Sequence, residues 1–193
     1  MSTDASPAST SHAPGAAPAA GRHALADALV ADALVADALA GLEQLKALAE
    51  RAVAQVDDRA IAVALGDEAN SIAVLLRHVA GNLRSRWTDF LDTDGEKPDR
   101  DRDGEFEARA ADADRARLLA DWDVAWGICL ASIGALGADD LQRTVTIRGE
   151  PVSVVAAIGR TQRHVAQHVG QIVLLAKHLA GDRWETLSIP RRR

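Results

Sequence analysis

Two histidines at helical spacing are the residues of this chain best suited to chemistry. His164 and His168 lie four residues apart in the stretch TQRHVAQHVGQIVLL, and Gln171 follows three residues later. Residues three or four apart share one face of a helix, so we expect these three side chains to line up beside the apolar positions. Two imidazoles one turn apart can bind one metal ion, because both rings lean the same way along the helix.

A third ligand must come from elsewhere in the chain, and His78 is the candidate. It lies on the flank of an apolar helix face, on a polar line with Asn82 and Ser85. A single histidine in such a place is more often a hydrogen-bonded, partly buried side chain, and HxxxH pairs are common on surfaces. The metal hypothesis is favoured because the pair adjoins an apolar stripe and because Asn82 and Gln171, which could orient ligands, lie one turn away.

The composition predicts one helical domain. The 193 residues are 48% hydrophobic but only 3% aromatic, which favours helices and allows a substantial core plus a tail. A net charge of −6 argues against nucleic acid as the main partner, and no apolar run approaches the roughly 18 residues of a membrane span. The single cysteine, Cys129, excludes an internal disulfide, and the first residues do not resemble a secretory signal. We therefore expect a cytoplasmic protein.

Hydrophobic periodicity and capping residues predict the elements. Four long helices are expected, over residues 24–56, 70–91, 105–136 and 153–181. Thr144 to Pro151 has alternating and turn-forming residues, which indicate a short β-hairpin before the last helix. The simplest arrangement is an all-α fold, an antiparallel four-helix bundle. Its domain is predicted to span residues 23–190, between a disordered Ala/Pro/Ser tail at 1–22 and a basic end at 191–193.

Three further stretches carry expectations. Residues 26–40 repeat ADALV, ADALV, ADALA, and a five-residue step moves the leucines around the helix. The repeat fits either a partner-binding extension or an expansion tolerated near a terminus, and the second is favoured. Residues 92–104, DTDGEKPDRDRDG, lack the spacing of an EF-hand, so we predict a solvated loop that binds no calcium. Residues 184–190 are predicted to pack back across the bundle, and His178 is assigned to the surface.

At the residues of this candidate site, the chain resembles the DinB/YfiT-like superfamily of metal-dependent proteins. The matching pieces are NSIAVLLRHVAGNLRSRWTDFL, DTDGEKPDRDRDGEFE, HVAQHVGQIVLLAK and WETLSIP. Their order is similar to that of the superfamily, with a histidine on the second helix and HxxxHxGQ on the fourth. The GN-RSRWTDFL-TDGEKP stretch looks like that of an uncharacterised bacterial branch. The resemblance covers roughly residues 42–190.

The resemblance implies a four-helix bundle in which His78, His164 and His168 ligate one divalent metal, with zinc, nickel, iron and manganese as candidates. Members of the superfamily often form homodimers. Characterised relatives include thiol-dependent S-transferases and isomerases, and many members have no known activity. We therefore expect a metal-dependent transferase or hydrolase that acts on a small molecule, with a low-molecular-weight thiol as a candidate second cofactor. Arg84 and Arg86 are candidates for binding a substrate carboxylate. The rival hypothesis is a non-catalytic metal-binding or stress-response interaction protein.

Overall fold

The computed structural model describes residues 17–107, 109, 112 and 114–189, which form a mainly helical protein with one small β-hairpin. The helices are α1 (Ala17–Val53), α2 (Ile72–Trp87), α3 (Arg115–Gly134), the short α4 (Ala138–Leu141) and α5 (Val154–Ala180). Single 3₁₀ turns lie at Ala60–Ala62, Gly104–Phe106 and Gly181–Arg183. Strands β1 (Thr144–Ile147) and β2 (Glu150–Ser153) pair antiparallel, so the expected hairpin is present. Among the described helices, none has the length and apolar character needed to cross a bilayer.

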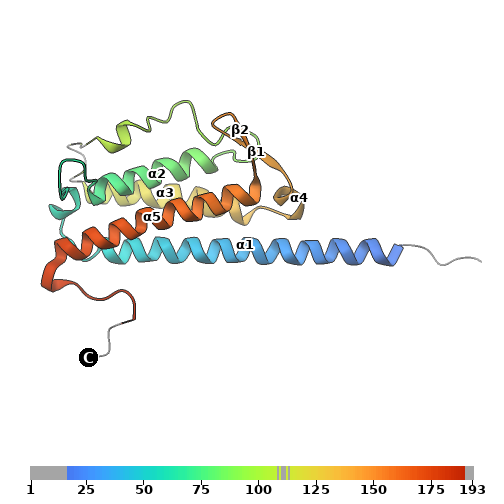
Figure 1. The fold of residues 1–193 in the computed structure, drawn as a ribbon, viewed down its shortest axis with the longest axis horizontal. Coiled ribbons are helices and arrows are strands. Elements are labelled where there is room, and N and C mark those ends of the chain that lie inside the picture. Colours follow the sequence, from blue (N-terminus) through green and yellow to red (C-terminus); the bar gives the residue numbers. More distant parts are fainter. Residues whose placement is uncertain (1–16, 108, 110–111, 113, 190–193) are drawn as a thin grey trace, which may run out of the picture.

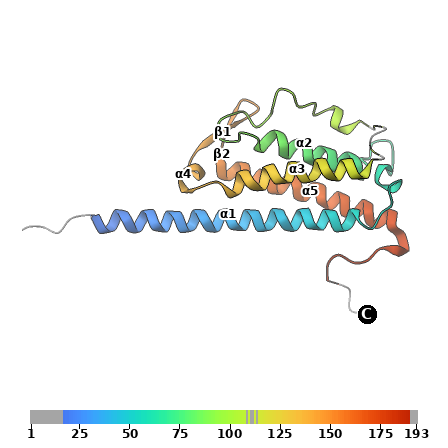
Figure 2. The same ribbon diagram turned by 180° about the vertical axis from the view of Figure 1, so that it is seen from behind.

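The four long helices α1, α2, α3 and α5 lie side by side (Figures 1 and 2). α2 packs mainly on α3, and α1 packs mainly on α5, while contacts between α1 and α3 and between α2 and α5 join the two pairs. Three tryptophans, Trp87, Trp122 and Trp126, are among the largest fully buried side chains of the core. The apolar faces of these helices therefore meet in one core, and α2 and α5 are brought next to each other.

Serine caps fix the starts of the two helices that carry the histidines. The Ser71 hydroxyl accepts a hydrogen bond from Val74 N at 3.2 Å, and the Ser153 hydroxyl accepts one from Ala156 N at 3.2 Å. Both helix starts agree with the sequence prediction. α2 ends at Trp87 instead of residue 91, because the backbone of Thr88 is extended, with ψ of 124°, and Asp89 then adopts a left-handed conformation with φ of 46°.

The prediction of a helix from residue 105 was wrong in its start. α3 begins at Arg115, where the side chain of Asp114 accepts a hydrogen bond from Arg117 N at 3.0 Å. Residues 104–106 instead form a 3₁₀ turn that lies against α2. Arg77 of α2 holds this turn, because its Nε donates to the Glu105 carbonyl at 3.0 Å and its terminal nitrogens bind Asp112 and the Glu107 carbonyl.

Helix α1 begins at Ala17, before the predicted residue 24, and Pro18 lies in its first turn, where the missing N–H of proline has no cost. It extends beyond the other helices towards its N-terminal end (Figure 1). Leu25, Leu29 and Val30 are exposed there. Further along, one face of the helix is buried, at Ala31, Val35 and Ala38 of the repeat and at Leu42 just after it. The tail was predicted over residues 1–22, of which 17–22 belong to α1; residues 1–16 and the basic end at 191–193 lie outside the described residues.

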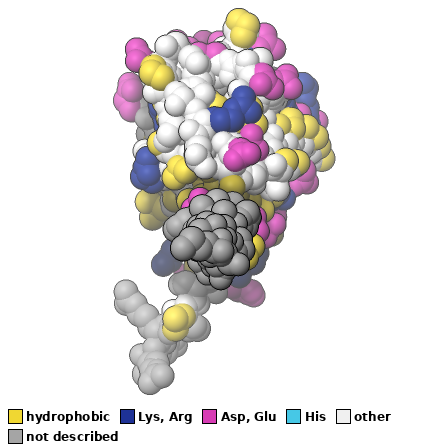
Figure 3. All heavy atoms as spheres, turned by 90° about the vertical axis from the view of Figure 1, so that its right-hand side faces the viewer, with side chains coloured by type: hydrophobic (Ala, Val, Ile, Leu, Met, Phe, Trp, Pro, Cys, Tyr) yellow, Lys and Arg dark blue, Asp and Glu magenta, His cyan; other side chains and the backbone are white. Residues whose placement is uncertain are grey.

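The loop after α2 is joined to the hairpin rather than freely solvated. The Asp94 carboxylate accepts hydrogen bonds from the backbone N–H groups of Arg148 and Gly149, at 2.8 and 2.7 Å. Gly149 has a φ of 76°, which the hairpin turn requires and glycine adopts without strain. Seen from this end of the molecule, acidic, basic and hydrophobic side chains are mixed over the visible surface (Figure 3).

The C-terminal segment returns to the helices only in part. Trp184 and Leu187 pack against the core, and Glu185 exchanges two hydrogen bonds with the side chain of Gln55, at 2.7 and 3.1 Å. Ile189 is 93% exposed, so the prediction that it packs back was wrong. The Gln55 contact anchors the segment before Ile189, and Pro190 lies outside the described residues.

Candidate metal centre

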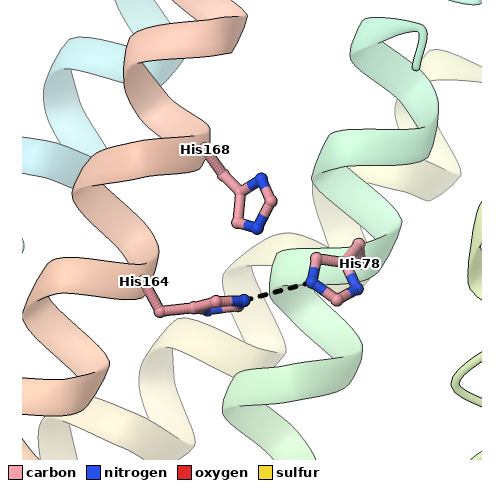
Figure 4. Close-up of side chains that lie close together, drawn as sticks. All are labelled: His78, His164 and His168. Carbon is pink, nitrogen blue, oxygen red and sulfur yellow. Dashed lines mark hydrogen bonds between the residues drawn. The ribbon is translucent and has the colours of Figure 1, made fainter. Parts of the chain in front are cut away.

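Three histidines from two helices point toward one another between α2 and α5 (Figure 4). His78 comes from α2, and His164 and His168 come from α5. The Nε2 atoms of His78 and His164 are 3.1 Å apart, and one ligand atom of each ring lies within 4.8 Å of the other two. His78 is 4% exposed and His168 is 9% exposed, so the cluster is largely shielded from solvent.

The hydrogen bonds of the outer ring nitrogens assign the tautomers of two of these histidines. His78 Nδ1–H donates to Glu105 Oε2 at 2.9 Å, and His168 Nδ1–H donates to Gln171 Oε1 at 2.8 Å. Their Nε2 atoms are therefore free of hydrogen and present lone pairs toward the centre of the cluster. His164 Nδ1 is buried and has no hydrogen-bond partner among the described residues.

Glu105 is the functional residue that the sequence reasoning missed. Its carboxylate binds His78 on one side and accepts two parallel hydrogen bonds from Arg100 on the other, both at 2.8 Å. The side chains of Glu105 and Arg100 are only 9% and 5% exposed. A carboxylate behind a histidine fixes the ring orientation and makes its free nitrogen a stronger ligand. Nothing near Glu105 in the sequence indicated this role, because its partner lies 27 residues away.

Gly81 provides the space for this carboxylate. A methyl group at Gly81 would overlap Glu105 Oε1 and lie 2.8 Å from Glu105 Cδ, so any larger residue forces Glu105 to move. The adjoining Phe106 ring packs on His78 with 4.5 Å between ring centroids. The 3₁₀ turn thus covers the ring of His78 while Glu105 orients it.

The electrostatic surroundings keep two of the rings neutral. Burial, followed by the neighbouring rings of His168 and His78, lowers the pKa of His164 to about 3. Burial also lowers the pKa of His168. For Glu105, burial would raise the pKa, but hydrogen bonds from His78 and Arg100 outweigh it, so its pKa is lowered. At neutral pH the rings of His164 and His168 are therefore unprotonated, and the Glu105 carboxylate is ionised.

These residues fit a divalent transition metal. Metal–nitrogen distances of about 2.0–2.1 Å place neighbouring ligand nitrogens about 2.9–3.4 Å apart for tetrahedral or octahedral angles. The separation of 3.1 Å between the Nε2 atoms of His78 and His164 falls in this range. Without a metal this contact is a hydrogen bond, because His164 Nε2–H can donate to the unprotonated Nε2 of His78, and a metal ion would replace that hydrogen and bind both nitrogens. The three-histidine cluster could therefore hold a metal ion.

The other candidate residues are placed differently. Asn82 is partly buried and makes no hydrogen bond to the histidines in the described part of the chain. Arg84 points outward, 3.9 Å from Asp121, and borders a cavity of about 650 Å³ that Glu105 also lines. Arg86 is buried, at 4% exposure. His178 is exposed, as predicted.

Comparison with known proteins gives one match. The model of a family described as a protein of unknown function (DUF1572) matches residues 30–193, which include all three histidines. No curated protein and no solved structure matches the sequence. Because the family match spans most of the chain, this protein belongs to the DUF1572 family.

Proposed function

We propose that this protein is a divalent-metal-dependent enzyme of the DinB-like kind, in which α1, α2, α3 and α5 form a four-helix bundle. His78, His164 and His168 are the metal ligands of this proposal. The observation that carries it is the pair of outer hydrogen bonds from His78 to Glu105 and from His168 to Gln171, at 2.9 and 2.8 Å. They direct two lone pairs to one point, which a merely structural histidine cluster does not need.

A metal held by three neutral imidazoles keeps its positive charge and lowers the pKa of a thiol or water molecule at an open coordination position. The residues of the chain have separate tasks. Glu105 orients His78 and is itself held by Arg100, while Phe106 limits the access of solvent to the His78 ring. This arrangement suits thiol-dependent group transfer or hydrolysis of a small molecule, with zinc, nickel, iron or manganese as the metal.

Cobalt substitution tests the proposal and separates it from non-catalytic metal binding. Metal-free protein is titrated with Co²⁺, and the visible spectrum is followed before and after addition of a low-molecular-weight thiol. We expect one equivalent of Co²⁺ to bind, and the thiol to add a sulfur-to-cobalt charge-transfer band. A cobalt spectrum that neither a thiol nor a change of pH alters indicates a closed site, and the enzyme proposal then fails.

Two further expectations belong to this proposal. We propose a cytoplasmic location, and we propose a homodimer on the basis of the DinB-like resemblance alone. Sedimentation equilibrium at micromolar concentration checks the second. A mass of two chains supports the dimer, and a mass of one chain at all concentrations contradicts it.

A further inference from the structure

Arg86 is a buried cation for which the described residues provide no anionic partner. The residue is 4% exposed, and its Nε atom is buried and makes no hydrogen bond to them. Within residues 17–107, 109, 112 and 114–189, no ion pair to Arg86 is present, although Arg77 and Arg100 of the same region each bind a carboxylate. Burying a guanidinium without a partner is costly, so an anion that reaches this side chain would be stabilised there.

The position of this side chain is fixed by its packing. A methyl group at Gly95 would lie 2.9 Å from Arg86 Cδ, 3.1 Å from its Nε and 3.3 Å from Ile147 Cγ1, so the loop and the hairpin enclose the arginine closely. Gly95 is anchored in turn, because its N–H donates to the Thr146 carbonyl at 2.8 Å and its carbonyl accepts from Ser85 Oγ at 3.3 Å. The Cδ–Nε part of the side chain is therefore fixed by packing before any ligand binds.

Arg86 lies on the hairpin side of the histidine cluster. It follows His78 by eight residues on α2, which corresponds to about 12 Å along the helix axis. The helices α2 and α5 run in opposite directions (Figure 1), so Arg160, four residues before His164, lies toward the same end. The charge of Arg86 contributes to the lowered pKa of His164, after burial, the two other rings and Arg100.

The surroundings of Arg86 have an excess of positive charge. Burial lowers the pKa of Arg86 to about 10, and the nearby charge of Arg160 acts in the same direction. Glu96 acts in the opposite direction, but it already pairs with Arg100 at 3.4 Å and with Arg148 at 3.3 Å. A divalent metal with three neutral ligands would add to this positive field, which favours an anion.

We propose that Arg86 binds the carboxylate or phosphate group of an elongated substrate whose reacting atom lies at the three-histidine cluster. The planar guanidinium fork matches both oxyanions by two parallel hydrogen bonds. This inference rests on the proposed metal-dependent function for the role of the histidine cluster, but the anion site itself can be measured without metal.

The test uses the full-length, metal-free protein, with sodium acetate and inorganic phosphate as probes against sodium chloride at constant ionic strength. Arg86→Met is compared with the parent and with Arg84→Met, which removes an exposed arginine from the same helix. We expect acetate or phosphate to raise the melting temperature of the parent and of Arg84→Met. Loss of charge-assisted hydrogen bonds should weaken binding to Arg86→Met by about 10- to 100-fold. The more effective probe identifies the oxyanion.

Two outcomes overturn the proposal: neither anion binds the parent, or Arg86→Met binds the anion as tightly as the parent does. If Arg86→Met does not fold, Arg86→Lys is measured instead, because lysine keeps the positive charge but lacks the planar guanidinium group. Anion binding by Arg86→Lys as tight as that of the parent then contradicts the proposal. A parallel zinc titration separates the two ideas. If the parent binds zinc but anion binding does not depend on Arg86, the proposed function stands and the anion site is rejected. If anion binding depends on Arg86 but the protein binds no zinc, the anion site stands and the proposed function is rejected.

Discussion

Replacing Glu105 by Gln tests the support behind His78 without changing the shape of the side chain. The amide oxygen of the introduced glutamine could still accept a hydrogen bond from His78 Nδ1–H, but it carries no negative charge. Arg100 would lose the carboxylate to which it donates two hydrogen bonds, both at 2.8 Å. Loss of a partner of this kind weakens metal binding by about 10- to 100-fold, or about 1.4–2.7 kcal/mol. The lost charged hydrogen bonds should also lower the free energy of unfolding by about 1.5–3 kcal/mol.

The assay is a zinc titration against a competing chelator at pH 7, together with denaturant unfolding of the metal-free protein. Glu107→Gln is the matched control, because Glu107 lies two residues away and is exposed. It makes the same change of charge and should retain the zinc affinity of the parent. If Glu105→Gln also binds zinc with the parent affinity, the carboxylate does not support the ligand, and our reasoning about the cluster is refuted.

Three other predictions follow from the same contacts. Gly81→Ala places a methyl group against Glu105 Oε1 and should weaken zinc binding about tenfold. Gly127→Ala is the control, because a methyl group there meets no atom within 4 Å. It should leave zinc binding unchanged and raise the free energy of unfolding by about 0.5–1 kcal/mol. Cys129 is buried, which raises the pKa of its thiol, so it should react with a thiol reagent only after unfolding; rapid reaction of the native protein contradicts this. His164 has a pKa of about 3 in the folded protein against about 6.5 when unfolded, so the unfolded state takes up a proton first. The metal-free protein should therefore lose stability as the pH falls from about 6.5 toward 3, and denaturant unfolding should show a weaker pH dependence for His164→Ala; an equal dependence in both contradicts the assignment.

Local signals in the sequence were sufficient to predict much of the fold. Ser153 was correctly expected to cap α5, and of the two candidates for the start of α2, Asn70 and Ser71, the structure shows Ser71; an N-cap depends only on residues a few positions away. The hairpin also followed from local alternation and a glycine turn. The start of α3 was wrong because Glu105 has a good helical propensity, which its long-range bonds to His78 and Arg100 override.

The three histidines of the candidate site could be predicted from the sequence, but some of the residues around them could not. Helical spacing was enough to place His164 and His168 on one face, and a polar flank suggested His78. The roles of Glu105 and Arg86 depend on how the loop after α2 folds over that helix, and no periodicity describes that loop. Asn82 was expected near the ligands, but the structure places Glu105, not Asn82, on the outer nitrogen of His78.

The metal content of the purified protein tests the central hypothesis most directly. The parent, His168→Ala and His178→Ala are purified without an affinity tag, reconstituted with zinc, and measured by elemental analysis. We predict one zinc per chain in the parent and in His178→Ala, because His178 is exposed, and a loss of most of the zinc from His168→Ala, which should remain folded. Stoichiometric zinc in His168→Ala, or no zinc in the parent, would contradict the assignment of these histidines as a metal centre.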